Sequence, residues 1–186
     1  MASEVDIWSI ALAHLGNEPI TLYDDPGKPA RLCRLLYPGV RDAVLRAYPW
    51  RCARAEKLLA RLATAPSSTY TYGYQLPTDP WCLWVPKMLN EDLEYQVMGR
   101  YLLSDESSVR ITFIRRVTDP GMFDSLLSDT IAERLASDLA WPITGVSGLG
   151  ESILKKYMLK LAEARTMDAM EGDTAGYESN PLVECR

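Results

Sequence analysis

Residues 41–61 read RDAVLRAYPWRCARAEKLLAR, and this stretch decides how the N-terminal half of the chain folds. Apolar residues recur at helical spacing as far as Ala47, and Pro49 disfavours helical geometry at Tyr48, so a helix is expected to end there. After this break, apolar residues again recur every three or four positions, with cations about 100° further round the helical wheel. The pattern predicts a second helix that reaches about residue 62.

Trp50 stands at the corner between these two predicted helices. Burial of its ring is expected to contribute on the order of 2–3 kcal/mol from apolar area alone. A corner anchored in this way would aim the following segment in a fixed direction.

The segment after the corner is rich in positive charge. Residues 41–61 hold six cations and two carboxylates, so they carry +4, whereas the rest of the chain carries −9 and the whole chain −5. Two interpretations are open: a solvated face, or a contact with an acidic neighbour. A contact between unlike surfaces of identical copies closes into rings or grows into filaments. The candidate interface cations are Arg51, Arg54, Lys57 and Arg61.

The composition bounds the class of protein. A chain of 186 residues fits one domain with a proper core, and no apolar run approaches the ~20 residues that cross a bilayer, so we expect a soluble protein. Acidic residues occupy the N-terminus, where a secretory signal needs basic ones. The four cysteines lie far apart without a C-x-x-C pair, which favours reduced thiols in a cytoplasmic setting and no metal site.

Two helices are expected before the corner, the second of which is the one that ends near Ala47. Ser3 and Asp6 form a capping-box-like start to a helix over about residues 4–15. A second helical pattern contains Pro38-Gly39, which predicts either a kink or two short helices in sequence.

Between residues 70 and 117 the apolar period changes from 3.6 to 2. β-Branched and aromatic residues alternate with polar ones and are separated by turn-forming residues, which predicts a small antiparallel sheet. Gly99-Arg100 is the expected hairpin turn.

Aromatic residues gather at the start of this region. Tyr70, Tyr72 and Tyr74 alternate on one strand face, with Trp81 and Trp84 close behind. Such residues serve either in ordinary sheet packing or at an interface with another subunit. Stacking on bases is a third reading, which the acidic balance of the chain disfavours.

The C-terminal third returns to helical spacing. Asp119-Pro120 predicts a helix start, and this helix is expected to end by Pro142. After a glycine-rich turn, a last amphipathic helix reaches about Met170. Residues 172–186 lack periodicity and are expected to form an extended arm or a disordered tail.

The predicted fold class is therefore α+β. A bundle of about four to five helices carries a small antiparallel sheet between its N-terminal and C-terminal helices. The expected organisation is a single domain over residues 1–171, with helices in 4–62, the sheet in 70–117 and helices in 119–171, followed by the arm at 172–186.

No constellation of residues favours catalysis, so no catalytic residue, metal ligand or cofactor site is assigned. His14 is the only histidine, which excludes mechanisms that need two imidazoles. The glycines of the ITGVSGLG stretch lack the preceding strand and the following Lys-Ser/Thr of a phosphate-binding loop.

The combination of segments resembles the phage head-to-tail adaptor family, often called tail tubular protein A, over about residues 3–171. The matching segments are ALAHLGNEPI, RLCRLLYPGVRDAVLRAYPW, YTYGYQLP, VTDPGMFDSLLSDTIAERLASDLAWPITG and KLAEARTMDAMEG. RDAVLRAYPW and TDPGMFD, flanking a tyrosine-rich strand, are the most distinctive pair. Carried over, the fold-signature positions are Arg41, Asp42, Pro49, Trp50, Asp119, Pro120 and Phe123.

The resemblance implies a structural virion protein that is not an enzyme. It would be assembled in the host cytoplasm as a ring, usually of twelve copies, at the head-tail junction. Its partners would be other copies of itself, the portal protein and a downstream tail or nozzle protein, with double-stranded DNA passing transiently through its channel and no membrane involved. The arm becomes the candidate portal-binding segment, with Tyr177, Pro181, Leu182 and Val183 as candidate contacts.

Two alternatives from other classes stay open. A small cytoplasmic enzyme with a carboxylate and tyrosine site predicts a deep pocket of ionisable groups with perturbed pKa values. A helical nucleic-acid-binding regulator predicts salt-sensitive DNA affinity carried by the segment at 51–61.

Overall fold

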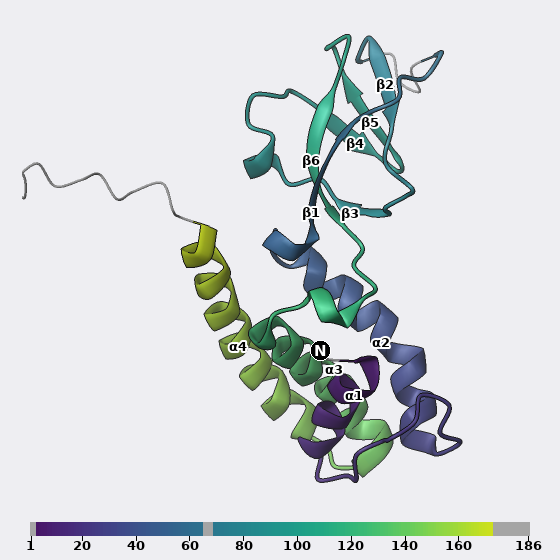
Figure 1. Ribbon diagram of the computed structural model, residues 1–186, viewed down its shortest axis with the longest axis vertical. Helices are drawn as coiled ribbons and strands as arrows, with labels where there is room; N and C mark the ends of the chain where they lie inside the picture. The colour runs from purple at the N-terminus through teal and green to yellow at the C-terminus, as the bar shows by residue number, and fades with distance from the viewer. Residues whose placement is uncertain (1–2, 65–68, 173–186) are drawn as a thin grey trace, which may run out of the picture.

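The protein is elongated, with helices at one end and strands at the other (Figure 1). The computed structural model describes residues 3–64 and 69–172, and within these it contains four α-helices and six β-strands. The fold is mixed α+β, as the sequence predicts. The strands follow α2 and precede α3 in the chain, but they form an end of the molecule of their own rather than a layer among the helices.

The two N-terminal helices are α1 (Glu4–Ala13) and α2 (Lys28–Arg46). The predicted capping box is confirmed: the Asp6 N–H donates to Ser3 Oγ at 3.1 Å, and the Ser3 N–H donates to Asp6 Oδ2 at 2.8 Å. α2 continues through Pro38, so the alternative of two short helices is wrong. Pro38 lies on the exposed side of α2, where water can reach the carbonyl that lacks a donor.

Residues 51–62 do not form the predicted helix. A short 3-10 helix, η1 (Arg51–Ala53), leads directly into strand β1 (Arg54–Leu58). β1 pairs antiparallel with β6 (Arg110–Arg115) along its whole length. The backbone hydrogen bonds of this pairing outweigh the local helical spacing, because a strand at this position can complete a sheet whose next strand is strongly apolar.

The strands form two small sheets instead of the single sheet expected. One has the order β1-β6-β3 and the other β2-β5-β4, and all neighbours are antiparallel. The remaining strands are β2 (Tyr72–Gln75), β3 (Cys82–Trp84), β4 (Gln96–Met98) and β5 (Tyr101–Ser104). The expected hairpin at Gly99-Arg100 is confirmed, since Met98 pairs with Tyr101 and Gly99 has a φ of 60°, which glycine adopts without strain.

The C-terminal helices are α3 (Ser125–Thr144) and α4 (Leu149–Gly172). The prediction that α3 starts at Asp119-Pro120 is wrong: those residues form the 3-10 helix η3 (Pro120–Met122), and Asp124 caps α3 by accepting from the Leu127 N–H at 2.7 Å. The prediction that α3 ends by Pro142 is also wrong. A proline near the C-terminus of a helix removes only one backbone hydrogen bond, so α3 continues to Thr144. The helix ends at Gly145, whose φ is 68°.

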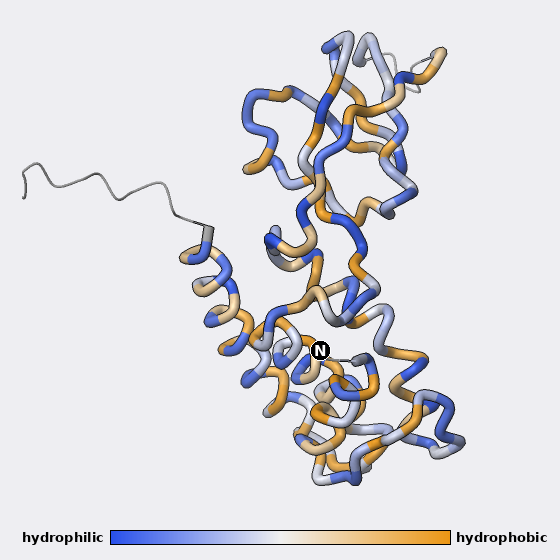
Figure 2. Tube along the Cα trace, viewed as in Figure 1, coloured by the Kyte–Doolittle hydropathy of each residue, from blue (hydrophilic) through white to orange (hydrophobic). Residues whose placement is uncertain are grey.

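Each end of the molecule has its own hydrophobic cluster. The larger cluster packs α1 to α4 and extends to Ile114 and Val117 beyond the helices, while the smaller one fills the space between the two sheets. Hydrophobic stretches accordingly occur in both ends of the chain trace (Figure 2). Trp50 belongs to the larger cluster and is fully buried, with its Nε1 donating to the Val44 carbonyl at 2.9 Å. The expected burial of this ring at the corner is confirmed.

Candidate functional site: the arginine–tryptophan cleft

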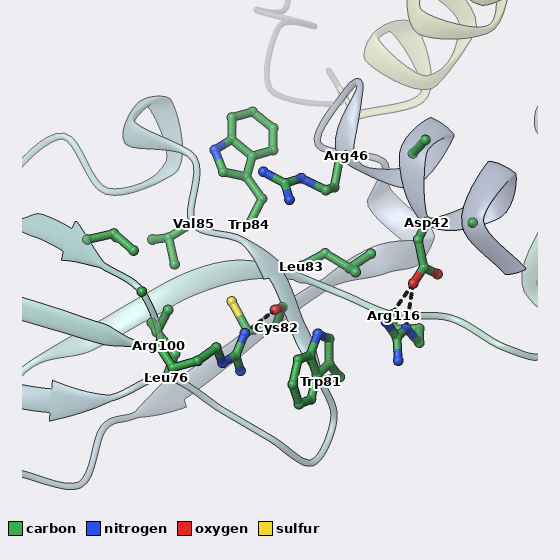
Figure 3. Close-up of a pocket in the computed structure, with 14 residues that line it drawn as sticks. Asp42, Arg46, Leu76, Trp81, Cys82, Leu83, Trp84, Val85, Arg100 and Arg116 are labelled. Atoms are coloured by element: carbon green, nitrogen blue, oxygen red, sulfur yellow. Dashed lines mark hydrogen bonds and ion pairs between the residues drawn. The ribbon is translucent and has the colours of Figure 1, made fainter.

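A cavity lies where the helical end meets the strands. It has a volume of about 700 Å³ and opens between α2, β3 and the β4–β5 turn. We call it the arginine–tryptophan cleft, because three arginines and two tryptophans surround it (Figure 3). Its charged and aromatic lining consists of Asp42, Arg46, Trp81, Trp84, Arg100 and Arg116.

Trp81 forms one wall of the cleft and lies between two guanidinium groups. The Arg100 guanidinium is 4.1 Å from the centre of the indole ring, and the Arg116 guanidinium is 5.5 Å away. Arg100 is fixed further by donating to the carbonyls of Cys82 at 2.8 Å and Pro77 at 2.6 Å. Cations over an indole face are held by its quadrupole, so this wall is preorganised. Trp81 is nevertheless 39% exposed and can be reached from solvent.

A single carboxylate organises the α2 side of the cleft. Asp42 Oδ2 accepts from Arg116 Nε at 2.7 Å, and Asp42 Oδ1 accepts from Arg41 Nη2 at 2.9 Å. Arg41 is almost fully buried and stands over the Tyr37 ring. Asp42 thus ties α2 to the segment after β6.

Arg46 is the arginine of the cleft whose guanidinium group has no bonding partner among the described residues. Within residues 3–64 and 69–172, no hydrogen bond or ion pair is formed by its guanidinium group, which stands beside Trp84 at the cleft (Figure 3). The cleft therefore offers more positive than negative charge. Burial raises the pKa of the Cys82 thiol to about 11, in spite of the opposing Arg100 charge, so this thiol is protonated at neutral pH.

The four predicted interface cations are not gathered into one row. Arg51 Nη1 lies 3.4 Å from Glu171 Oε2, and Arg54 Nε donates to the Pro49 carbonyl at 2.8 Å. Lys57 Nζ donates to the Asp79 carbonyl at 2.9 Å, and the Arg61 guanidinium stands 5.0 Å from the centre of the Tyr72 ring. Arg54 and Lys57 point to opposite faces of β1 because they are three positions apart in a strand. Their role at an interface stays a prediction, but their expected arrangement on one helix face is wrong.

The predicted aromatic set divides into two groups. Tyr74 belongs to the core between the sheets, where its hydroxyl donates to the Glu106 carbonyl. Tyr72 is the first residue of β2 and Tyr70 lies before that strand, so the expected alternation of all three tyrosines on one strand is wrong for Tyr70. Both residues are partly buried, whereas Trp81 and Trp84 line the cleft. The proposed arm contacts Tyr177, Pro181, Leu182 and Val183 lie outside the described residues.

The remaining fold-signature residues have structural roles. Asp119 Oδ1 accepts from the Gly121 N–H at 2.8 Å and caps η3, whose first residue is Pro120. Phe123 is buried in the larger cluster, directly before the cap of α3.

A buried carboxylate marks the junction of η1 and α4. Asp168 Oδ1 accepts from the Arg51 N–H at 3.2 Å, and burial raises the pKa of Asp168 above its ordinary value in spite of that hydrogen bond. Its charged form therefore opposes folding at neutral pH. This opposition disappears as the pH falls below the ordinary pKa of an aspartate, where the group is protonated in both states.

An exposed acidic loop is the second charged feature of the strand end. The acidic loop comprises Glu91, Asp92 and Glu94, which follow the 3-10 helix η2 (Lys87–Leu89) and are all exposed. Within the described part of the chain, their carboxylates form no hydrogen bond or ion pair.

Asn90 fixes the start of the acidic loop and was missed by sequence reasoning. Its Nδ2 donates to the carbonyls of Pro86 at 2.9 Å and Thr112 at 2.8 Å, and its Oδ1 accepts from the Thr112 N–H at 2.9 Å. Asn90 is 9% exposed, so these bonds are shielded from water. One asparagine in a loop gives no sequence signal for such a role.

Comparison with known proteins found no matching family model and no matching curated protein. None of the helices in the described ranges is both long enough and apolar enough to span a bilayer. In the same ranges, no group of three or more histidine, cysteine or acidic side chains could hold a metal ion.

Proposed function

We propose that this chain is a head-to-tail adaptor of a phage particle, whose copies form a ring between the portal and the tail. The work of such a subunit is geometric: it presents separate surfaces to its neighbours and to the two structures that it joins. The proposal rests on the family resemblance of the sequence and on the surfaces described below.

The observation that carries the proposal is an apolar outer face on α4. Met158, Leu159 and Met170 lie on α4, the longest helix of the described chain, and each side chain is more than half exposed. With Ala162 and Thr166 they form one uncharged stripe at helical spacing. Exposed apolar surface of this kind marks contacts between proteins, and a ring subunit needs such contacts.

The chemistry of the cleft also supports recognition. Arg100 is fixed by carbonyl groups and an indole ring, Arg116 is fixed by Asp42, and the one thiol of the cleft is protonated at neutral pH. Arginine and tryptophan are the residues most enriched among the energetic centres of protein interfaces. A surface of this composition suits a partner that brings carboxylates.

Deleting residues 172–186 is expected to abolish attachment to the portal and to leave the fold intact, because α4 has completed its packing before this point. Purified portal assemblies are mixed with full-length or truncated chain, and bound chain is measured by co-sedimentation. Circular dichroism melting of the free chains provides the control for folding. Equal binding by the two chains would remove the arm from the mechanism.

A further inference from the structure

The acidic loop and the arginine–tryptophan cleft are two separate charged surfaces. η2 and the loop that follows it lie on the left of the strands in Figure 1, the loop before β3 lies on their right, and the end of α2 that borders the cleft lies below them. None of the three acidic residues of the loop lines the cleft of its own chain.

The charges of the two surfaces match. The cleft presents Arg46, which lacks a partner among the described residues, together with Arg100, whose guanidinium is bonded only to neutral carbonyls. The loop presents three exposed carboxylates without partners in the described chain. Opposite charges that face one another across an interface favour the correct register and disfavour others.

The apolar parts of the two surfaces match as well. Met88 in η2 is 58% exposed and precedes the acidic loop. Trp81 and Trp84 line the cleft, beside Leu83 and Val85. A flexible thioether packs well against indole rings, so η2 can supply the apolar anchor and the loop the charges.

We propose that the acidic loop of one copy binds in the arginine–tryptophan cleft of the next copy. This contact joins unlike surfaces, so successive copies are related by a rotation that can close into a ring. Asn90 is a positioning residue for this contact, because its three hydrogen bonds fix the start of the loop against β6. The inference rests on the proposed function and names the two faces that meet.

Charge reversal tests the contact without disturbing the fold. Arg46→Glu alters the cleft, and the double variant Glu91→Lys, Asp92→Lys alters the loop; none of these side chains forms a hydrogen bond or ion pair in the described chain. Self-association of the full chain is measured by sedimentation velocity at low salt. Each variant alone is expected to associate at least about tenfold more weakly than the unmodified chain, because like charges then face one another.

Mixing the two variants in equal amounts provides a rescue. Every contact in an alternating assembly then pairs opposite charges, so association is expected to return to within about threefold of the unmodified chain. A general loss of folding or solubility could not be restored in this way. Unchanged association of the separate variants, or no rescue on mixing, would overturn the inference.

A chemical measurement locates the contact directly. Arg46→Lys keeps the charge and introduces an amine, which a zero-length carbodiimide can join to a carboxylate with loss of water. Isotope-labelled and unlabelled copies are mixed, and mass spectrometry is expected to find amide bonds between position 46 of one copy and Glu91, Asp92 or Glu94 of another. Links only to other carboxylates would refute the contact.

The two proposals fail in different ways. If each charge-reversed variant on its own formed a ring at the portal as well as the unmodified chain does, the adaptor function would stand. The proposed contact between loop and cleft would then be refuted. Cross-linked copies that never form a ring at a portal would leave the contact standing and remove the adaptor function.

Discussion

Replacing Trp50 by alanine is expected to lower the free energy of unfolding by about 3–5 kcal/mol. The ring is fully buried, packs edge-on against Tyr48 with centroids 5.0 Å apart, and donates its N–H to the Val44 carbonyl. Its removal leaves a cavity at the corner where α2 turns toward the strands, and it leaves a buried carbonyl without that donor. Urea unfolding followed by far-ultraviolet circular dichroism measures the effect.

Two further variants make this result specific. Trp141→Ala removes the same side chain from a position that is 67% exposed, so a change of within about 0.5 kcal/mol is expected. Trp50→Phe keeps much of the apolar volume and is the informative variant if the alanine chain does not fold. A loss from Trp50→Ala no larger than that from Trp141→Ala would show that the corner is not anchored by this ring.

Replacing Asp42 by alanine is expected to cost about 3–5 kcal/mol, the range found when one partner of a buried ion pair is removed. The side chain of Arg41 is only 7% exposed, so its charge would be left in the interior without its carboxylate. Arg116 would lose the same partner at the edge of the cleft. Urea unfolding measures the loss, and the separation of the helical end from the strands is expected to accompany it.

Asp138→Ala is the matched control for this variant. Asp138 pairs with Arg134 at 3.3 Å on α3, but both side chains are about one-third exposed. Exposed pairs one helical turn apart contribute about 0.3–0.5 kcal/mol, so the control should change little. If the two aspartates proved equal, the Arg41–Asp42–Arg116 group would be no more than a surface feature.

Local sequence signals predict the elements whose stabilising contacts lie within a few residues. The capping box of Ser3 and Asp6 and the hairpin at Gly99-Arg100 are both confirmed, because each depends on a bond or a backbone angle that neighbouring residues determine. Burial of Ile153, Tyr157 and Leu161 on one side of α4 agrees with the predicted amphipathic helix.

The largest error concerns residues 51–62, where helical spacing and strand pairing compete. A five-residue segment with several charged side chains gives no sequence signal for a strand, and β1 exists because β6, more than fifty residues later, pairs with it. Pairing partners that are distant in sequence cannot be read from a local period. The same limit explains why one sheet was expected and two are found.

The cleft was beyond prediction for a related reason. Its residues come from α2, β3, the β4–β5 turn and the segment after β6, and each carries an unremarkable local signal. Trp81 and Trp84 are among the predicted interface residues, a role that stays a prediction, whereas the arginines beside them are not among those residues. The cations of the basic segment at 51–61 lie within a few residues of one another, so a local pattern indicates them. The cations of the cleft are distant in sequence and are neighbours only in space.

The central claim is that copies of this chain form a closed ring between a portal and a tail. The most direct test is cryo-electron microscopy of the full chain mixed with purified portal assemblies. The account predicts a closed ring of rotationally related copies on one face of the portal, with the cleft of each copy against the acidic loop of the next. Isolated subunits, or open filaments with no contact to the portal, would contradict it.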